Sequence, residues 1–514
     1  MTVNAVRWAA PNGLRRAGRL AVDFDRHPLE HFRVRPELDL DHRLGAEVAA
    51  EGEEHDRRER AGDQECGANA NGVELQGRPP LERGPGDSGQ RSYRPVAESG
   101  FRARHPIGVE SPGMTPRAAS IVFAAALGVA LRAACGVRAC RCPSARRVAH
   151  RLEGLNDEPA HFAYARYLAD HRAFPVQSHH AAEPGAFARA DFEYYQPPLY
   201  YLVCAPMVGV AGERAGSWSA AAVSFVAGLL SLLVLWNILP RLGLGDPARR
   251  IGVAFAALLP VHVYFTSIAS NDGLCWLFAL LLTRELVMRA AGETSGPADV
   301  RLGMLLGLGM LTKSALAVFY PVAFLVYLLD ARRASPRRAL VGGLIALGVS
   351  LLIAGPWYAR NLSLYGSVLA LDVGFGPHEP GRWSLNAQAH AALGTLRSFW
   401  FPMQHVASQW TVRGLRGLEL VLAACHVVAL AWFLRRRRPL GAPLSVAFAV
   451  LVMAFASHIA LSFSWGESEG RFLLTALAPI VYIIVAPVFA RDEQWAWAYL
   501  LLLAAHPYVF LAFG

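Results

Sequence analysis

Two adjacent carboxylates, Asp157 and Glu158, lie in a polar stretch between the first apolar segments of the chain. A carboxylate that accepts a proton from a hydroxyl can act as the general base of a group-transfer reaction. Consecutive helical residues point about 100° apart, so the two carboxylates cannot both face one target. Asp157 and His161 are one turn apart and can share a polar face with Tyr164. The same stretch is also explained as a helix start, with Asn156 as the cap and acids in the first turn.

Lys313 is the only lysine of the chain, and it lies in the apolar stretch 307–316. A cation in the middle of a bilayer costs about 2.5–3.5 kcal/mol on insertion scales, so it usually faces a partner, water or a ligand. One interpretation is a compact point charge that binds a phosphate group. The other is a lysine whose ammonium group reaches the membrane surface.

Other polar residues mark the ends of apolar segments and have a structural as well as a functional interpretation. Asn271 and Asp272 either cap a helix or add a second carboxylate to a site. Arg360 is either an interfacial anchor or a second phosphate ligand, and Arg471 is most simply an anchor. A third group is typical of an aromatic belt at a stiffened helix start, and it supplies further candidate contacts: Tyr195, Gln196 and Tyr200.

The composition predicts the fold class. The chain has 514 residues, of which 54% are hydrophobic, and its mean hydropathy is positive. Apolar blocks of about 17–25 residues match the length that spans a bilayer as a helix. We therefore expect an all-α, polytopic transmembrane helical bundle of about 11–12 spans.

Basic residues cluster in short loops, as at 332–338 and 435–438. Such clusters mark the cytoplasmic side and do not indicate nucleic-acid binding.

The apolar blocks and the charged loops together predict a topology. The segment 302–329 is either one long, tilted span or two short spans that meet near Lys313. The clusters at 332–338 require an odd number of crossings between residues 196 and 330, so we favour a single unit, which can be broken near Lys313. This choice places the loop 241–250 outside, although it carries three arginines. The expected spans are 117–135, 197–212, 217–239, 251–269, 271–289, 302–329, 338–357, 416–434, 442–464, 471–490 and 494–513.

Two polar loops, 136–196 and 358–415, are expected on the extracytoplasmic side, where they carry short helices. No repeat relates the two halves of the chain, which disfavours a symmetric transporter. Glycine loops for nucleotides, nucleophile elbows and zinc-protease helices are absent from the sequence.

The first 113 residues differ from the rest. They are rich in Arg, acidic residues, Gly and Pro, with no sustained apolar periodicity, which is typical of disorder. Our hypothesis is that translation starts at Met114 and that 1–113 is a misassigned extension; the alternative is a genuine disordered cytoplasmic tail. The expected domains are therefore 1–113 and a membrane domain at 114–514.

Taken in order, six short motifs resemble the GT-C superfamily of membrane glycosyltransferases, which includes protein mannosyltransferases and lipid A aminoarabinose transferases. The likeness covers roughly residues 117–490. The motifs are Asp157-Glu158-Pro159, Gln196-Pro197-Pro198-Leu199-Tyr200-Tyr201, Asn271-Asp272, Leu311-Thr312-Lys313, Trp357-Tyr358-Ala359-Arg360-Asn361 with Tyr365-Gly366, and Gly470-Arg471-Phe472.

The resemblance implies a donor sugar on polyprenyl phosphate, which meets a glycan, lipid or protein acceptor at the extracytoplasmic face of the inner membrane. It maps the catalytic carboxylate onto Asp157 and the donor-phosphate contacts onto Lys313 and Arg360. Glu158 would orient the acceptor or help to hold a divalent cation, the one candidate cofactor; no complete metal shell is assigned. The substrate contacts implied are His161, which stands where some relatives carry an arginine nearby, and Tyr195, Gln196, Tyr200, Asn271, Asp272 and Arg471.

The sequence thus predicts an inverting membrane glycosyltransferase that transfers a hexosyl or pentosyl group to a hydroxyl. A membrane transporter or lipid flippase is the alternative that would use Lys313 and Asp272 along a translocation path. A non-catalytic subunit of an envelope-assembly complex is a third possibility, in which the acidic pair only caps a helix.

Overall fold

The computed structural model describes most of the chain from Asp157 onward. The described residues are 157–178, 191–294, 296–375, 384–400, 440–465 and 468–489, with scattered positions between 421 and 435. The predictions about 1–113 and Met114, the spans at 117–135 and 494–513, and most of the span at 416–434 lie outside them.

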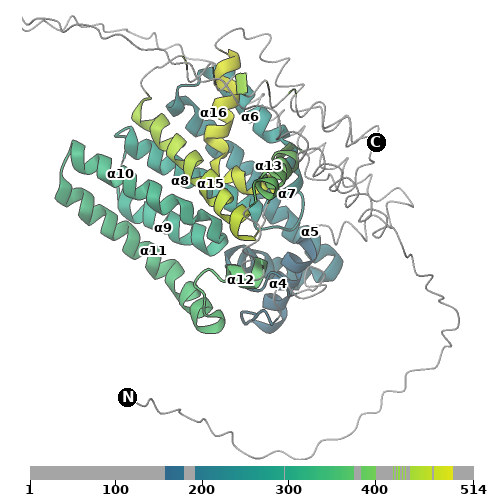
Figure 1. The fold of residues 1–514 in the computed structure, drawn as a ribbon. Coiled ribbons are helices and arrows are strands. Elements are labelled where there is room, and N and C mark those ends of the chain that lie inside the picture. The colour runs from purple at the N-terminus through teal and green to yellow at the C-terminus, as the bar shows by residue number, and fades with distance from the viewer. Residues whose placement is uncertain are drawn as a thin grey trace, which may run out of the picture. The chain divides into compact units, whose positions relative to one another are not determined.

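The described residues form helices joined by turns and contain no strand (Figure 1), which confirms the all-α fold class. The first half contains α4 (Glu158–His171), α5 (Leu199–Ile238), η2 (Leu239–Leu242), α6 (Asp246–Leu258), α7 (Pro260–Phe265), α8 (Asp272–Ala290) and α9 (Ala298–Thr312). The second half contains η3 (Ser314–Val318), α10 (Phe319–Arg333), α11 (Pro336–Tyr365), α12 (Leu371–Phe375), α13 (Leu385–Trp400), α15 (Ala442–Trp465), η5 (Gly470–Ala476) and α16 (Leu477–Phe489).

Several of these helices suit a bilayer. Large apolar side chains are exposed on them, such as Leu352 at 79% and Val452 at 63%, and surfaces of this kind face lipid more readily than water. Within the described residues, five segments are long and apolar enough to cross a membrane: Ala215–Leu242, Ser314–Arg333, Pro336–Tyr365, Ala442–Trp465 and Gly470–Val488. The protein is a multi-pass membrane protein.

Helix α8 lies at the centre of the bundle, where it packs against α5, α9, α10 and α15 (Figure 1). Its large side chains, such as Trp276 and Leu282, are fully buried. Its buried acid Glu285 accepts two hydrogen bonds from Arg301 of α9, at 2.6 and 2.8 Å. A charge inside a helical bundle requires such a partner, so this pair fixes how α8 and α9 face each other.

The expected span at 197–212 does not cross the bundle. The backbone of Gly212 has φ 71°, which interrupts the 40-residue α5. The Tyr200 hydroxyl lies 3.0 Å from Oγ of Ser224, which itself donates a hydrogen bond to the carbonyl of Ser270, so the first turn of α5 already lies level with the start of α8. The segment Leu199–Gly212 therefore folds back on the start of the following span. Apolar length alone predicted a crossing here, and that prediction is wrong.

The expected single span at 302–329 is also wrong, because the chain reverses there. The backbone at Lys313 is extended and ends α9, and α10 runs back toward the start of α9. Arg289 at the end of α8 binds both Asp299 and Asp330, each at 2.6 Å. Since these acids lie near the first residue of α9 and the last residues of α10, the two helices form an antiparallel hairpin with Lys313 at its turn.

These two differences compensate each other in the topology. The expected span at 197–212 folds back and adds no crossing, whereas the expected span at 302–329 becomes two antiparallel helices. The number of crossings between 196 and 330 therefore stays odd. Arg241 pairs with Glu293 at 2.8 Å, and Arg333 donates a hydrogen bond to the carbonyl of Ala290. The loop 241–250 therefore lies at the same end of the bundle as the arginines of 332–338. The apparent exception to the positive-inside rule disappears.

A labelling experiment tests this topology. In a background without the native cysteines, Gly245→Cys and Arg337→Cys should react with an impermeant maleimide from the same side of the membrane. Ser363→Cys, at the other end of α11, should react only from the opposite side. Labelling of position 245 and position 363 from one side would contradict the hairpin arrangement.

Small residues bring α9 and α11 into close contact. A Cβ at Gly303 would lie 2.5 Å from the carbonyl oxygen of Ala346, and one at Gly307 would lie 2.8 Å from Ile353. Glycines of this kind allow two membrane helices to approach along their backbones. The position of Lys313, nearly two turns beyond these contacts, depends on this approach.

We predict that Gly303→Ala lowers the free energy of unfolding by about 1–3 kcal/mol, the usual effect of overpacking. Gly348→Ala is the matched control, because a Cβ there meets nothing within 4 Å. The control should be neutral or stabilising by up to about 1 kcal/mol through helix propensity. Unfolding of both variants in mild detergent, followed by SDS titration, measures the difference. Equal stability of the two would contradict the close packing.

Candidate active site

The polar motifs of the sequence meet at the end of the bundle where α4 and α12 lie (Figure 1). Asp157 is the N-cap of α4, and Asp272 is the first residue of α8. Lys313 forms the break between α9 and η3, and Arg471 belongs to η5. Residues that are up to 314 positions apart along the chain are thereby brought into contact.

Lys313 is paired with Asp272. Its Nζ lies 2.5 Å from Oδ1 of that carboxylate, and both side chains are buried. The ring of Phe472 lies below the ammonium group, at 5.3 Å. The extended backbone of Lys313 ends α9 at the level of the first turn of α8, which explains why the lysine reaches this partner. This geometry does not agree with the alternative in which the ammonium group of Lys313 extends to the membrane surface.

Arg471 joins the two carboxylates. Its Nη2 lies 2.9 Å from Oδ2 of Asp157, and its Nη1 lies 3.5 Å from Oδ2 of Asp272. The same guanidinium group also pairs with Glu469 and lies over the ring of Phe265 at 4.8 Å. Arg471 is therefore not a simple anchor, because its charged side chain lies at the centre of the cluster.

The charges of this cluster govern the ionisation of Asp157. Burial disfavours its carboxylate form, but Arg471, His161 and Lys313 together outweigh burial and hold the pKa of Asp157 below its usual value. Burial lowers the pKa of His161 to about 4. At neutral pH, Asp157 is therefore a carboxylate and His161 a neutral imidazole.

Glu158 points away from Asp157, as expected for consecutive residues. Its Oε1 accepts a hydrogen bond of 2.8 Å from the backbone N–H of Ala269. This bond ties the start of α4 to the turn before Asp272. Glu158 thus contributes to the arrangement of the site by holding two of its elements together.

Residues of the second motif form a hydrogen-bond chain beside the cluster. Asn271 donates a bond of 3.0 Å from its side chain to Oε1 of Gln196, and Gln196 donates one of 3.2 Å to the Tyr195 hydroxyl. The Oδ1 of Asn271 is buried without a hydrogen-bond partner. Tyr200 instead bonds Ala220 inside the α5 hairpin, so its hydroxyl is engaged in the fold.

His161 and Glu193 lie next to Asp157, and Glu193 is a residue that the sequence interpretation did not select. Atoms of the three side chains that can bind a metal lie within 4.8 Å of one another. Burial, reinforced by the negative charge of Asp157, raises the pKa of Glu193 well above its usual value. The sequence feature that could have identified Glu193 is its place as an acid in the last polar turn before an apolar segment.

Arg360 lies apart from the Lys313 pair in the described contacts. Its Nη2 donates a hydrogen bond of 2.5 Å to the carbonyl of Pro175, and its guanidinium group lies 4.5 Å from the centre of the Trp357 ring. Its Nη1 is buried without a hydrogen-bond partner. The structure thus gives Arg360 a role in holding the chain that follows α4, and its contact with a donor phosphate stays a prediction.

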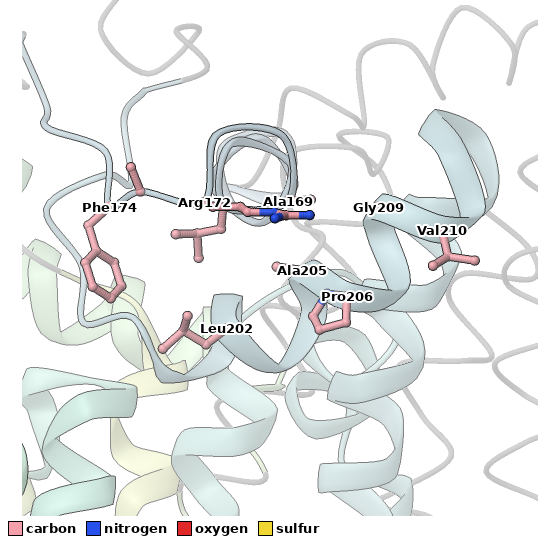
Figure 2. Close-up of a pocket in the computed structure, with 10 residues that line it drawn as sticks. Ala169, Arg172, Phe174, Leu202, Ala205, Pro206, Gly209 and Val210 are labelled. Atoms are coloured by element: carbon pink, nitrogen blue, oxygen red, sulfur yellow. The ribbon is translucent and has the colours of Figure 1, made fainter.

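A pocket of about 530 Å³ lies between the C-terminal end of α4 and the first arm of α5 (Figure 2). Its lining is mainly apolar, with Arg172 as its one charged side chain. The lining residues are Leu168, Ala169, Arg172, Ala173, Phe174, Leu202, Ala205, Pro206, Gly209 and Val210. The predicted site residues are not among them, so this pocket and the ion-pair cluster are different features.

Comparison with solved structures finds weak likenesses. ArnT from Cupriavidus metallidurans bound to undecaprenyl phosphate is 16% identical over 68% of this chain and 58% of that chain, with a TM-score of 0.43. The Archaeoglobus fulgidus oligosaccharyltransferase in complex with Zn and sulfate is 14% identical over 76% of this chain and 52% of that chain, with a TM-score of 0.43. The chain spans little more than half the length of these proteins, and likenesses at this level carry no argument about its site.

Comparison with protein families is more informative, although a search of curated proteins found no significant match. Residues 195–358 match a family described as dolichyl-phosphate-mannose-protein mannosyltransferase. The matched part contains Gln196, Asp272 and Lys313, in the order in which the sequence motifs resemble the superfamily. This part of the chain is therefore similar to a family of membrane glycosyltransferases.

Proposed function

We propose that this protein is an inverting glycosyltransferase that moves a sugar from a polyprenyl-phosphate donor to an acceptor hydroxyl. The observation that carries the proposal is the ion-pair cluster of Asp157, Arg471, Asp272 and Lys313. It combines a carboxylate that can accept a proton with two cations that can bind an anion. The family match over residues 195–358 supports the choice of a lipid-phosphate sugar as donor.

In the proposed reaction, Asp157 is the general base. The acceptor oxygen attacks the anomeric carbon, its proton passes to the Asp157 carboxylate, and the bond from the anomeric carbon to the phosphate oxygen breaks. A single displacement of this kind inverts the anomeric centre. A positioned general base contributes about 10²–10⁴-fold to such a step.

Lys313 and Arg471 stabilise the leaving group in this proposal. The polyprenyl phosphate gains a negative charge as it departs, and preorganised cations lower the free energy of a transition state in which charge develops. Asp272 bonds both cations and so holds them on one side of Asp157. Arg360, with its unpartnered Nη1, remains a candidate for a further phosphate contact.

The resting site has a consequence for the order of events. Arg471 is bonded to the proposed base, so a donor phosphate that attracts this guanidinium group releases the Asp157 carboxylate. Donor binding would then make the base available to the acceptor. Without the donor, Arg471 keeps Asp157 engaged.

The same proposal places the reaction at the extracytoplasmic face of the inner membrane. The ion-pair cluster lies at the end of the bundle opposite to Arg241 and Arg333, and arginine-rich loops are usually cytoplasmic. The described helices α4 and α12, which belong to the loops 136–196 and 358–415, lie at this end of the bundle (Figure 1). The acceptor is a glycan, lipid or protein that reaches this face.

We predict that Asp157→Asn lowers sugar transfer by at least about 10²-fold, because the amide cannot accept the proton. The measurement uses the full chain in proteoliposomes with polyprenyl-phosphate mannose, the kind of donor named in the matching family. Asp170→Asn is the matched control: this acid lies on the same helix but is exposed and pairs with Arg166, so transfer should be unchanged.

Three outcomes would reject parts of this proposal. Undiminished transfer by Asp157→Asn would exclude this residue as the base. Lipid or solute flux without transfer by the wild type would favour a transporter or flippase. Full tolerance of substitutions at both Asp157 and Lys313 in a complementation assay would favour a non-catalytic subunit.

We also predict that Lys313→Ala weakens binding of polyprenyl phosphate by about 10-fold or more, the scale of one charged hydrogen bond. Breaking a buried pair leaves Asp272 uncompensated and typically costs about 3–5 kcal/mol of stability. The double variant Lys313→Ala/Asp272→Ala removes both charges and should recover stability without recovering donor affinity. Recovery of donor affinity in the double variant would assign Lys313 a purely structural role.

A further inference from the structure

Three polar atoms near the C-terminal end of α11 are buried without a hydrogen-bond partner. They are Nε1 of Trp357, Nη1 of Arg360 and Oδ1 of Asn361. Trp357 is 5% exposed and Asn361 is 1% exposed, and these two side chains lie one turn apart on the same face of the helix. Buried polar groups are nearly always hydrogen-bonded, so three unpartnered atoms within five residues indicate a binding site.

A tryptophan near the end of a membrane helix is more often part of an interfacial belt. Trp357 does not face lipid head groups in that way. Its ring packs edge to face on Phe174, with centroids 5.4 Å apart, and the guanidinium group of Arg360 lies 4.5 Å from its centre. A buried indole N–H usually finds a partner, and a belt does not explain the unpartnered carbonyl oxygen of Asn361.

The chain that follows α4 holds this group of atoms in place. The carbonyl of Pro175 accepts a hydrogen bond of 2.5 Å from Nη2 of Arg360, and the backbone N–H of Gln177 donates one of 3.0 Å to the Tyr365 hydroxyl. Arg360 therefore uses one of its nitrogens to fix its guanidinium group, and the other is oriented without a partner. A site that is ordered before its ligand arrives loses less entropy on binding.

These atoms lie beside the end of α9 that carries Lys313. The Tyr358 hydroxyl donates a hydrogen bond of 2.9 Å to the carbonyl of Met310, and Trp357 packs in the same apolar cluster as Met310. A ligand whose reacting end lies at the ion-pair cluster could therefore contact these atoms with a part that does not react. Binding energy from such remote parts can contribute to catalysis.

The unpartnered atoms define the chemistry of the ligand. The N–H groups of Trp357 and Arg360 only donate hydrogen bonds, whereas Oδ1 of Asn361 only accepts them. An ionised phosphate offers acceptors alone and would leave Asn361 unsatisfied. A trans peptide group has a donor and an acceptor, but they point in opposite directions. Hydroxyls both donate and accept, so neighbouring hydroxyls on one sugar ring can serve all three atoms.

We propose that Trp357, Arg360 and Asn361 bind hydroxyl groups of a saccharide unit of the acceptor, away from the hydroxyl that reacts. This inference rests on the proposed function and narrows its acceptor to a glycan. The transferred sugar itself would lie beside Asp157 and Arg471, so a saccharide unit at the end of α11 belongs to the acceptor. Arg360 would then contact the acceptor in place of the donor phosphate.

The test is a binding measurement on the full chain in nanodiscs, without any transfer reaction. Wild-type protein is applied to an array of mono- and oligosaccharides, and titration calorimetry then measures its affinity for those that bind. Asn361→Leu, which keeps the size but removes the acceptor, should weaken this binding by about 10-fold. Trp357→Phe, which keeps an aromatic ring but removes the donor, should weaken it by about 3–10-fold.

Stability separates a binding role from a structural one. Because Asn361→Leu removes an unsatisfied polar atom from a buried position, the thermal midpoint of the resting protein should stay the same or rise. Asn237→Leu and Trp218→Phe are matched controls, since both residues are exposed on α5, and they should bind saccharides like the wild type. A lower midpoint of Asn361→Leu together with unchanged saccharide affinity would assign Asn361 a structural role and overturn the proposal.

The same variants identify the source of the hydroxyls. Both should bind polyprenyl-phosphate mannose with unchanged affinity, because the donor does not use this site. Weaker binding of that donor with unchanged saccharide binding would assign the site to the donor and overturn the proposal. It would also fail if the wild type bound no saccharide, or if peptides without sugar bound in its place. None of these outcomes depends on transfer, so they are distinguishable from a failure of the proposed reaction.

Discussion

The pairing of Lys313 with Asp272 is the constraint on which the arrangement of the site depends. A buried charge without a partner destabilises a fold by several kcal/mol, so α9 must end where its lysine reaches the first residue of α8. Arg471 extends this pairing to Asp157 at the start of α4. Four elements that are distant in the chain are therefore fixed in relation to one another by one set of charges. The turn of the α9–α10 hairpin, at Lys313, follows from the same requirement.

The opposite end of the hairpin is held in a similar way. Arg289 binds Asp299 and Asp330, while Gly303 and Gly307 let α9 approach α11 along its length. Directional ion pairs thus fix both ends of the hairpin, and close packing fixes its middle. This division suits a protein in a bilayer, where apolar burial against other helices gains little over burial in lipid.

The cluster also explains why an anionic donor would suit the site. Lys313 and Arg471 are each balanced in the resting protein by carboxylates of the chain, so neither of these two buried cations is unpaired while the protein waits for substrate. A phosphate would bind by exchange with these carboxylates, and the proposed base would be released in the same event.

The sequence by itself determined the helical membrane class, because apolar blocks of the required length leave few other folds. It also identified Asp157, Asp272 and Lys313 as candidate site residues, because a charge beside or within an apolar segment has a free-energy cost that usually indicates a function. It did not determine which apolar segments cross the membrane: a fold-back at Gly212 and a full span have the same hydropathy. Nor could it pair the charges, because partners such as Asp157 and Arg471 are brought together only by the packing of all the intervening helices. Glu193 was missed for the same reason, since an acid before a span acquires meaning only when tertiary structure buries it beside Asp157 and His161.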